Sequence, residues 1–135
     1  MDAFEKPAPT TPYERLGGLP MLEAISNHFY DLMEQDPAYA ELRAMHAPDL
    51  TRMRSALAQF LMGWSGGPRD WFEANPGRCM MSVHKPYVIG HGVAGQWSEA
   101  IGRAINAELG ESDPPLAKEM TRVLQQLALG MGRDG

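Results

Sequence analysis

The spacing of the apolar residues constrains the fold of this chain more than any other feature of its sequence. Apolar side chains recur every three or four positions instead of alternating, which is the period of an amphipathic helix. Glycine and proline interrupt this period at a few places, and each interruption predicts the end of one helix and the start of another. The sequence therefore predicts an all-α fold with four main helices and several short ones.

The first main helix is expected after Gly17-Gly18 and ends at Asp36-Pro37, because a residue before proline disfavours the helical backbone region. A short helical piece follows at residues 42–45. Asp49 is the predicted N-cap of the second main helix. The apolar faces of these two main helices are formed by Met21, Leu22, Ile25, Phe29, Leu32 and Met33, and then by Leu50, Met53, Leu57, Phe60, Leu61 and Trp64.

The stretch from Gly66-Gly67-Pro68 to residue 78 shows no period and is predicted to be a loop, with Trp71 and Phe72 holding it against the body. A helical turn is expected at residues 80–85, before Pro86. The last two main helices have apolar faces formed by Val93, Trp97, Ile101, Ile105 and Leu109, and by Leu116, Met120, Val123, Leu124 and Leu127.

Length and composition limit the class of protein. A chain of 135 residues makes one domain, predicted at 13–135 after a flexible tail at 1–12 that has no signal-peptide pattern. The net charge of -5 and the scattered basic residues argue against nucleic acid as a partner, and no apolar run is long enough to span a membrane. A single cysteine, Cys79, cannot form an internal disulfide, which favours a reducing, cytoplasmic setting.

Four residues carry possible chemistry, and each also has a purely structural interpretation. His84 lies on a short, largely apolar helical segment, where a neutral imidazole is a suitable axial ligand of haem iron. A lone histidine in such a place is more often a hydrogen-bonded core residue. In the same way, Tyr30 and Trp97 are interpreted first as half-buried or core aromatics, and His46 as the occupant of a helix end. Met80 lies on the same helix face as His84, so the two cannot bind opposite sides of one iron.

Taken in order along the chain, these features resemble the truncated haemoglobins, and specifically their second group. The resemblance covers about residues 13–131. It is carried by Tyr13-Glu14-Arg15-Leu16-Gly17-Gly18, Phe29-Tyr30, Phe60-Leu61, Gly66-Gly67-Pro68, His84-Lys85-Pro86-Tyr87 with Ile89, and Trp97.

That resemblance implies a globin-like, two-over-two helical sandwich around a haem b (iron protoporphyrin IX) held non-covalently. His84 matches the proximal iron ligand, Tyr30 the distal tyrosine, and Trp97 the pocket tryptophan of the second group. His46 falls at the pocket edge. Distal-helix positions that face the ligand match Met53 and Leu57, and cofactor contacts are expected from Phe60, Leu61 and Tyr87.

The chain departs from the family just before the proximal histidine. An arginine that reaches a haem propionate is usual there, and this chain has Val83. The anchoring of the propionate is therefore expected to pass to Lys85, Arg78 or Arg54, and the sequence does not choose among them.

Three functions from different classes follow as hypotheses. The first is reversible binding of O2 and other diatomic ligands such as NO and CO, with the Tyr30 hydroxyl and the Trp97 indole donating hydrogen bonds to the bound ligand. The second is a redox enzyme, either a nitric-oxide dioxygenase with a separate reductase or a peroxidase-like catalyst in which His46 is the only distal candidate for a base. The third is a haem-free helical interaction module. Either a monomer or a homodimer is compatible with the sequence.

Overall fold

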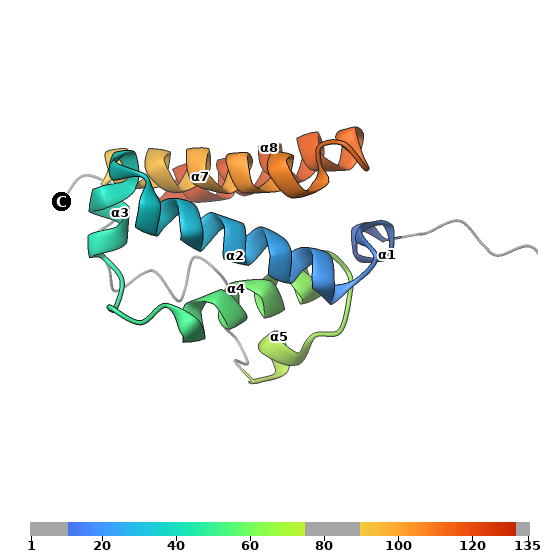
Figure 1. Ribbon diagram of the computed structural model, residues 1–135. Helices are drawn as coiled ribbons and strands as arrows, with labels where there is room; N and C mark the ends of the chain where they lie inside the picture. The colour runs from blue at the N-terminus through green and yellow to red at the C-terminus, as the bar shows by residue number, and fades with distance from the viewer. Residues whose placement is uncertain (1–10, 75–89, 132–135) are drawn as a thin grey trace, which may run out of the picture.

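A computed structural model of the chain describes residues 11–74 and 90–131 (Figure 1). Within these ranges there are helices and connecting turns and no β-strand. The four main helices are α2 (Leu19–Gln35), α4 (Thr51–Trp64), α7 (His91–Leu109) and α8 (Pro114–Met131). They agree with the four that the apolar spacing predicts, so the all-α prediction is confirmed.

The main helices form two packed layers, which is the two-over-two arrangement of a truncated globin fold. Helices α7 and α8 pack along each other, and α2 packs against both α4 and α7 (Figure 1). Helix α2 therefore joins the two layers, and its apolar face must be buried on more than one side. Its residues Leu22, Ile25 and Phe29 have no exposed surface. They continue into a core formed by Met33, Leu61, Ile101, Ile105, Leu109 and Leu124.

A short first helix, α1 (Pro12–Leu16), is present where the sequence analysis expected none. The Thr11 side chain caps it by accepting from the Glu14 N–H, and Gly17 ends it in the left-handed region at φ 83°. Arg15 donates to both carboxylate oxygens of Asp113, the residue just before α8. Helix α1 has five residues, too few to show an apolar period in the sequence, and its contact with the start of α8 stabilises it.

The expectation of a continuous loop after Gly67 is wrong in one segment, because Asp70–Ala74 form helix α5. Its aromatic residues do hold the segment against the body, as predicted: the rings of Trp71 and Phe72 lie 5.3 and 5.6 Å from that of Phe60. A segment of five residues is too short for its sequence to predict a helix. Helix α5 is stabilised mainly by packing on α4 and not by its intrinsic helix propensity.

The link between α2 and α4 contains two short helices. A 3-10 turn, η1 (Pro37–Tyr39), leads into α3 (Ala40–Ala44), in place of the single short piece expected at 42–45. The predicted N-cap of α4 is wrong by one residue: Leu50 is the N-cap and makes no side-chain cap hydrogen bond, while the Asp49 carboxylate just before it accepts the N–H of Thr51. The helical turn predicted at 80–85 lies outside the described residues.

Candidate functional site

Helices α2 and α7 meet through an aromatic contact. The ring of Phe29 lies edge-on to that of Trp97, with centroids 5.4 Å apart, and edge-on to that of Tyr30 at 4.8 Å. Phe29 is fully buried, Tyr30 is buried, and Trp97 is half-buried. Two residues that the sequence analysis assigned to one pocket are thus held around a single buried ring.

The ring of His46 also lies beside that of Tyr30. Their ring centroids are 6.0 Å apart with the planes nearly perpendicular. The Nδ1 atom of His46 lies 2.9 Å from the carbonyl oxygen of Leu42, one turn earlier in the chain. The three predicted distal residues, Tyr30, His46 and Trp97, therefore form one neighbourhood, although they come from three separate segments.

Tyr30 is a buried phenol on α2. Burial raises the pKa of Tyr30 from 10.0 to about 12, and the nearby Arg54 guanidinium opposes this shift by a smaller amount. The phenol therefore stays protonated and able to donate at any physiological pH. The indole N–H of Trp97 is a group that can only donate.

Helix α4 has two adjacent faces, and the predicted residues divide between them. Met53, Leu57 and Phe60 follow one another at helical spacing along one face. Met53 is 38% exposed, whereas Leu61, on the neighbouring face, has no exposed surface. Leu57 and Phe60 are 7% and 5% exposed, so Met53 is the residue of this face that is open to a further group. Leu61 is fully occupied by the protein core, so it is a packing residue in this structure and not a ready cofactor contact.

Arg54, one of three candidate propionate anchors, lies on the Leu61 side of α4 and reaches α2. Its guanidinium lies 2.8 Å from a Glu34 oxygen and 2.9 Å from an Asp31 oxygen, and donates to the Asn27 carbonyl at 3.0 Å. Two carboxylates and a carbonyl already use its donors. The expectation that Arg54 anchors a cofactor carboxylate is therefore not supported by its geometry, and the other two candidates lie outside the described residues.

The predicted site residues His84, Lys85 and Tyr87 also lie outside the described residues, so their placement remains a prediction. So does the position of Val83.

Four polar contacts link the α2–α4 connection to α7, and the sequence analysis identified none of them. The buried Tyr39 hydroxyl donates to Glu99 at 2.8 Å and accepts from Arg103 at 3.0 Å, while Arg103 also contacts Asp36. The Gln96 side chain accepts the N–H of Leu42 at 3.2 Å. Such contacts leave no periodic signal, since they depend on which turns of two distant helices lie side by side.

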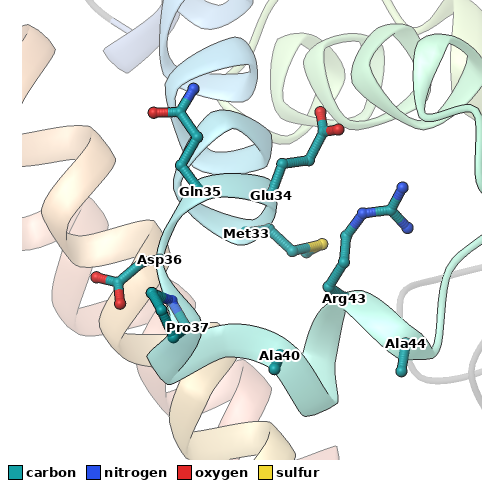
Figure 2. Close-up of a pocket in the computed structure, with 8 residues that line it drawn as sticks. All are labelled: Met33, Glu34, Gln35, Asp36, Pro37, Ala40, Arg43 and Ala44. Atoms are coloured by element: carbon teal, nitrogen blue, oxygen red, sulfur yellow. The ribbon is translucent and has the colours of Figure 1, made fainter.

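A separate open hollow of about 310 Å³ lies at the carboxyl end of α2, against η1 and α3. Figure 2 shows Met33 pointing into it between Glu34 and Arg43. The described residues that line it include none of those predicted for the site. It is therefore distinct from the aromatic neighbourhood of Tyr30 and Trp97.

A haem with a bound diatomic ligand makes two demands on these residues: an apolar surface for the macrocycle and donors for the ligand. The Met53, Leu57 and Phe60 face supplies apolar surface. The Tyr30 hydroxyl and Trp97 indole supply two donors beside the Phe29 ring. The described residues therefore fit the group that the sequence resemblance implies.

Comparison with known proteins places the chain in a family. Residues 11–132 match the model of the family described as bacterial-like globin. A group 1 truncated haemoglobin of Synechocystis sp. is 30% identical over 106 residues, covering 78% of this chain and 81% of the relative.

Solved structures agree in fold. A cold-adapted truncated haemoglobin from the Antarctic marine bacterium Pseudoalteromonas haloplanktis superimposes with a TM-score of 0.87 at 32% identity, covering 93% of this chain and 100% of that one. A group II 2-on-2 haemoglobin from Agrobacterium tumefaciens gives 0.88 at 25% identity, covering 97% and 100%. Since the family match spans nearly the whole chain and the two-layer fold agrees with it, this protein belongs to the bacterial-like globin family and has the truncated globin fold.

Proposed function

We propose that this protein binds haem b non-covalently through His84 and takes up O2, NO and CO reversibly on the side of the haem that faces Tyr30 and Trp97. The observation that carries this proposal is the pair of donors, on α2 and α7, held about the buried ring of Phe29. Membership of the globin family implies haem and a small diatomic ligand. The division of roles among these residues is our proposal.

When bound, the haem supplies a ferrous centre that takes a diatomic ligand and transfers partial negative charge to it. The protein's part is to stabilise that charge. The Tyr30 hydroxyl and the Trp97 indole donate hydrogen bonds to it, and each bond to a charged acceptor contributes about 1.5–3 kcal/mol. Two such bonds slow ligand release by on the order of a hundredfold or more. Tight binding or redox chemistry suits such slow release better than bulk transport does.

The macrocycle is expected to lie against the Met53, Leu57 and Phe60 face of α4, with Tyr87 as a further contact. Leu61 supports this face from behind, since it is buried in the core. Lys85 or Arg78 is the expected partner of a haem propionate, because Arg54 is held by Asp31 and Glu34.

We assign the protein to the second group of truncated haemoglobins on the combination of Tyr30, His46 and Trp97. The structural likeness to the Agrobacterium tumefaciens group II protein supports this assignment. The Synechocystis sp. relative belongs to group 1, so the family match alone does not decide the group.

The domain is proposed to span 13–135 after a tail at 1–12, in a cytoplasmic protein whose oligomeric state is a monomer or a homodimer. In the part of the chain that the structure describes, no helix has both the length and the apolar character needed to cross a bilayer.

A second candidate function is redox catalysis, as a nitric-oxide dioxygenase or a peroxidase-like enzyme. The observation that favours it is the position of His46, whose ring stands edge-on to Tyr30 and supplies a nitrogen base within the same neighbourhood as the two donors. A dioxygenase cycle would need electrons from a separate reductase.

Haem titration of the protein and of His84→Gly tests the proposed function. The wild type is expected to give a Soret band with one haem per chain, and His84→Gly to bind haem far more weakly until imidazole is added to fill the vacated ligand position. His28→Gln is the matched control, since His28 contacts Glu108 at the surface between α2 and α7 and should bind haem as the wild type does. An unaltered spectrum and affinity in His84→Gly would contradict the proposal.

A further inference from the structure

The backbone of Leu42 connects α7 to His46 by two hydrogen bonds, one at its N–H and one at its carbonyl oxygen. Its N–H donates to Gln96 Oε1 at 3.2 Å, and its carbonyl oxygen lies 2.9 Å from His46 Nδ1. We propose that Gln96 is a positioning residue that acts through Leu42 to hold the His46 imidazole with its proton on Nδ1, which makes Nε2 a proton acceptor on the ligand side of the haem. The part of this inference that concerns the haem rests on the proposed function.

The chemistry of the carbonyl group determines the tautomer. A carbonyl oxygen has no proton to give, so a hydrogen bond at 2.9 Å requires that His46 Nδ1 carries the hydrogen. In neutral imidazole the other nitrogen then has a lone pair and no hydrogen. His46 in this form accepts hydrogen bonds or protons at Nε2 and does not donate there.

The backbone on both sides of His46 is hydrogen-bonded within the protein. Its own N–H donates to the Arg43 carbonyl at 3.1 Å. Beyond it, the Arg43 guanidinium donates to the carbonyls of Ala47 and Pro48 at 3.0 and 2.8 Å. Leu42 is 3% exposed, so its peptide groups are withdrawn from water and depend on partners within the protein. Gln96 is the partner of its N–H.

The position of Gln96 in α7 connects this hydrogen bond to the candidate site. Gln96 immediately precedes Trp97, so the turn of α7 that presents the indole donor also supports the segment that carries His46. Across the site, Tyr30 and Trp97 donate, whereas His46 accepts. A neutral Nε2 can take a proton from hydrogen peroxide, giving an imidazolium and a hydroperoxide anion, and neither the phenol nor the indole can do so at neutral pH.

The experiment is nuclear magnetic resonance of protein labelled with 15N-histidine, using long-range correlations between ring protons and ring nitrogens, at about pH 8, where histidine is neutral. It is recorded on the CO-saturated haem protein and on the haem-free protein, and His46→Phe identifies the signal. The wild type is expected to show His46 protonated at Nδ1 only. Protonation mainly at Nε2 would overturn the proposal.

Two variants of Gln96 test its role in positioning. Gln96→Met keeps the length of the side chain and removes the acceptor, so the share of the Nε2–H tautomer is expected to rise at least about threefold. Gln96→Glu keeps an acceptor oxygen and is expected to restore the wild-type spectrum. Unchanged tautomer populations in a folded Gln96→Met would overturn the assignment of Gln96. If the wild type fails to bind haem, the proposed function fails, whereas the spectrum of the haem-free protein still decides the tautomer.

Discussion

The ring of Phe29 meets that of Trp97 edge-on, at a centroid distance of 5.4 Å, and this contact is where α2 and α7 join beside the site. It also brings the tyrosine that follows Phe29 close to the tryptophan of α7. A single buried phenylalanine thus holds two hydrogen-bond donors from opposite layers in the same neighbourhood. The first predictions concern those donors.

Trp97→Phe is expected to raise the O2 dissociation rate several-fold, because a phenyl ring keeps the packing against Phe29 and removes the indole donor. Stopped-flow measurement of O2 release checks this. An unchanged rate in Trp97→Phe would show that the indole does not contact the ligand.

Tyr30→Phe is expected to raise the same rate, and the wild-type rate is expected to stay constant as pH rises through the ordinary tyrosine range. Burial raises the pKa of Tyr30 to about 12, so the phenol remains a donor there.

The same shift makes the stability of the fold depend on pH. In the unfolded chain the Tyr30 phenol loses its proton near 10.0, whereas in the folded protein it keeps the proton up to about 12, so the free energy of unfolding is expected to fall between these two pH values. Ultraviolet titration of tyrosinate in both proteins checks the pKa. A Tyr30 that titrates near 10.0 would contradict the prediction.

His46→Phe is expected to lower any peroxidase turnover while O2 binding is retained. Phenylalanine preserves an aromatic ring next to Tyr30 and removes the nitrogen that accepts a proton. Peroxide turnover and O2 affinity, measured on the same preparation, separate the two effects. If turnover is indifferent to the change, His46 is not the base.

Gly63→Ala is expected to destabilise the protein by about 1–3 kcal/mol, because overpacking forces neighbouring groups to move. An added Cβ would lie 2.6 Å from two ring carbons of Phe72, which α5 packs against α4. Gly95→Ala in α7 is the control: its Cβ would meet nothing within 4 Å, so it should stabilise by about 0.5–1 kcal/mol through helix propensity. Urea unfolding of the haem-free variants measures both changes in the free energy of unfolding. An unchanged free energy of unfolding in Gly63→Ala would show that α5 can shift to accommodate the added methyl group.

Asp113→Asn is expected to reduce stability near neutral pH, with a loss that shrinks as the solution is acidified. The hydrogen bonds from Arg15 hold the pKa of Asp113 below its ordinary value. A lowered carboxyl pKa stabilises the fold above the unfolded pKa, and this contribution is lost as pH falls through the folded value. Urea unfolding near neutral pH and at about pH 3 compares the two proteins. A difference that does not depend on pH would contradict the assignment.

Much of the site is readable from the sequence because its aromatic residues lie on periodic helices. Tyr30 and Trp97 are placed by the same apolar spacing that predicts α2 and α7, and resemblance to a family adds His46. The division of α4 into two faces was less visible. Phe60 and Leu61 are adjacent in sequence, apolar and buried, and they differ in their contacts: Phe60 packs against Trp71 and Phe72 of α5, whereas Leu61 has no exposed surface.

The sequence by itself determined the number and order of the main helices, since the apolar period and the glycine and proline breaks are local properties of the chain. It did not determine the partners of the polar side chains. Arg54 is a plausible cofactor anchor by charge alone, and packing α4 against α2 commits it to Asp31 and Glu34. Gln96 has no special sequence context, and it gains a role because α3 brings the Leu42 N–H within 3.2 Å of it. Such contacts join residues far apart in the chain, and only the tertiary arrangement of the helices decides which of them form.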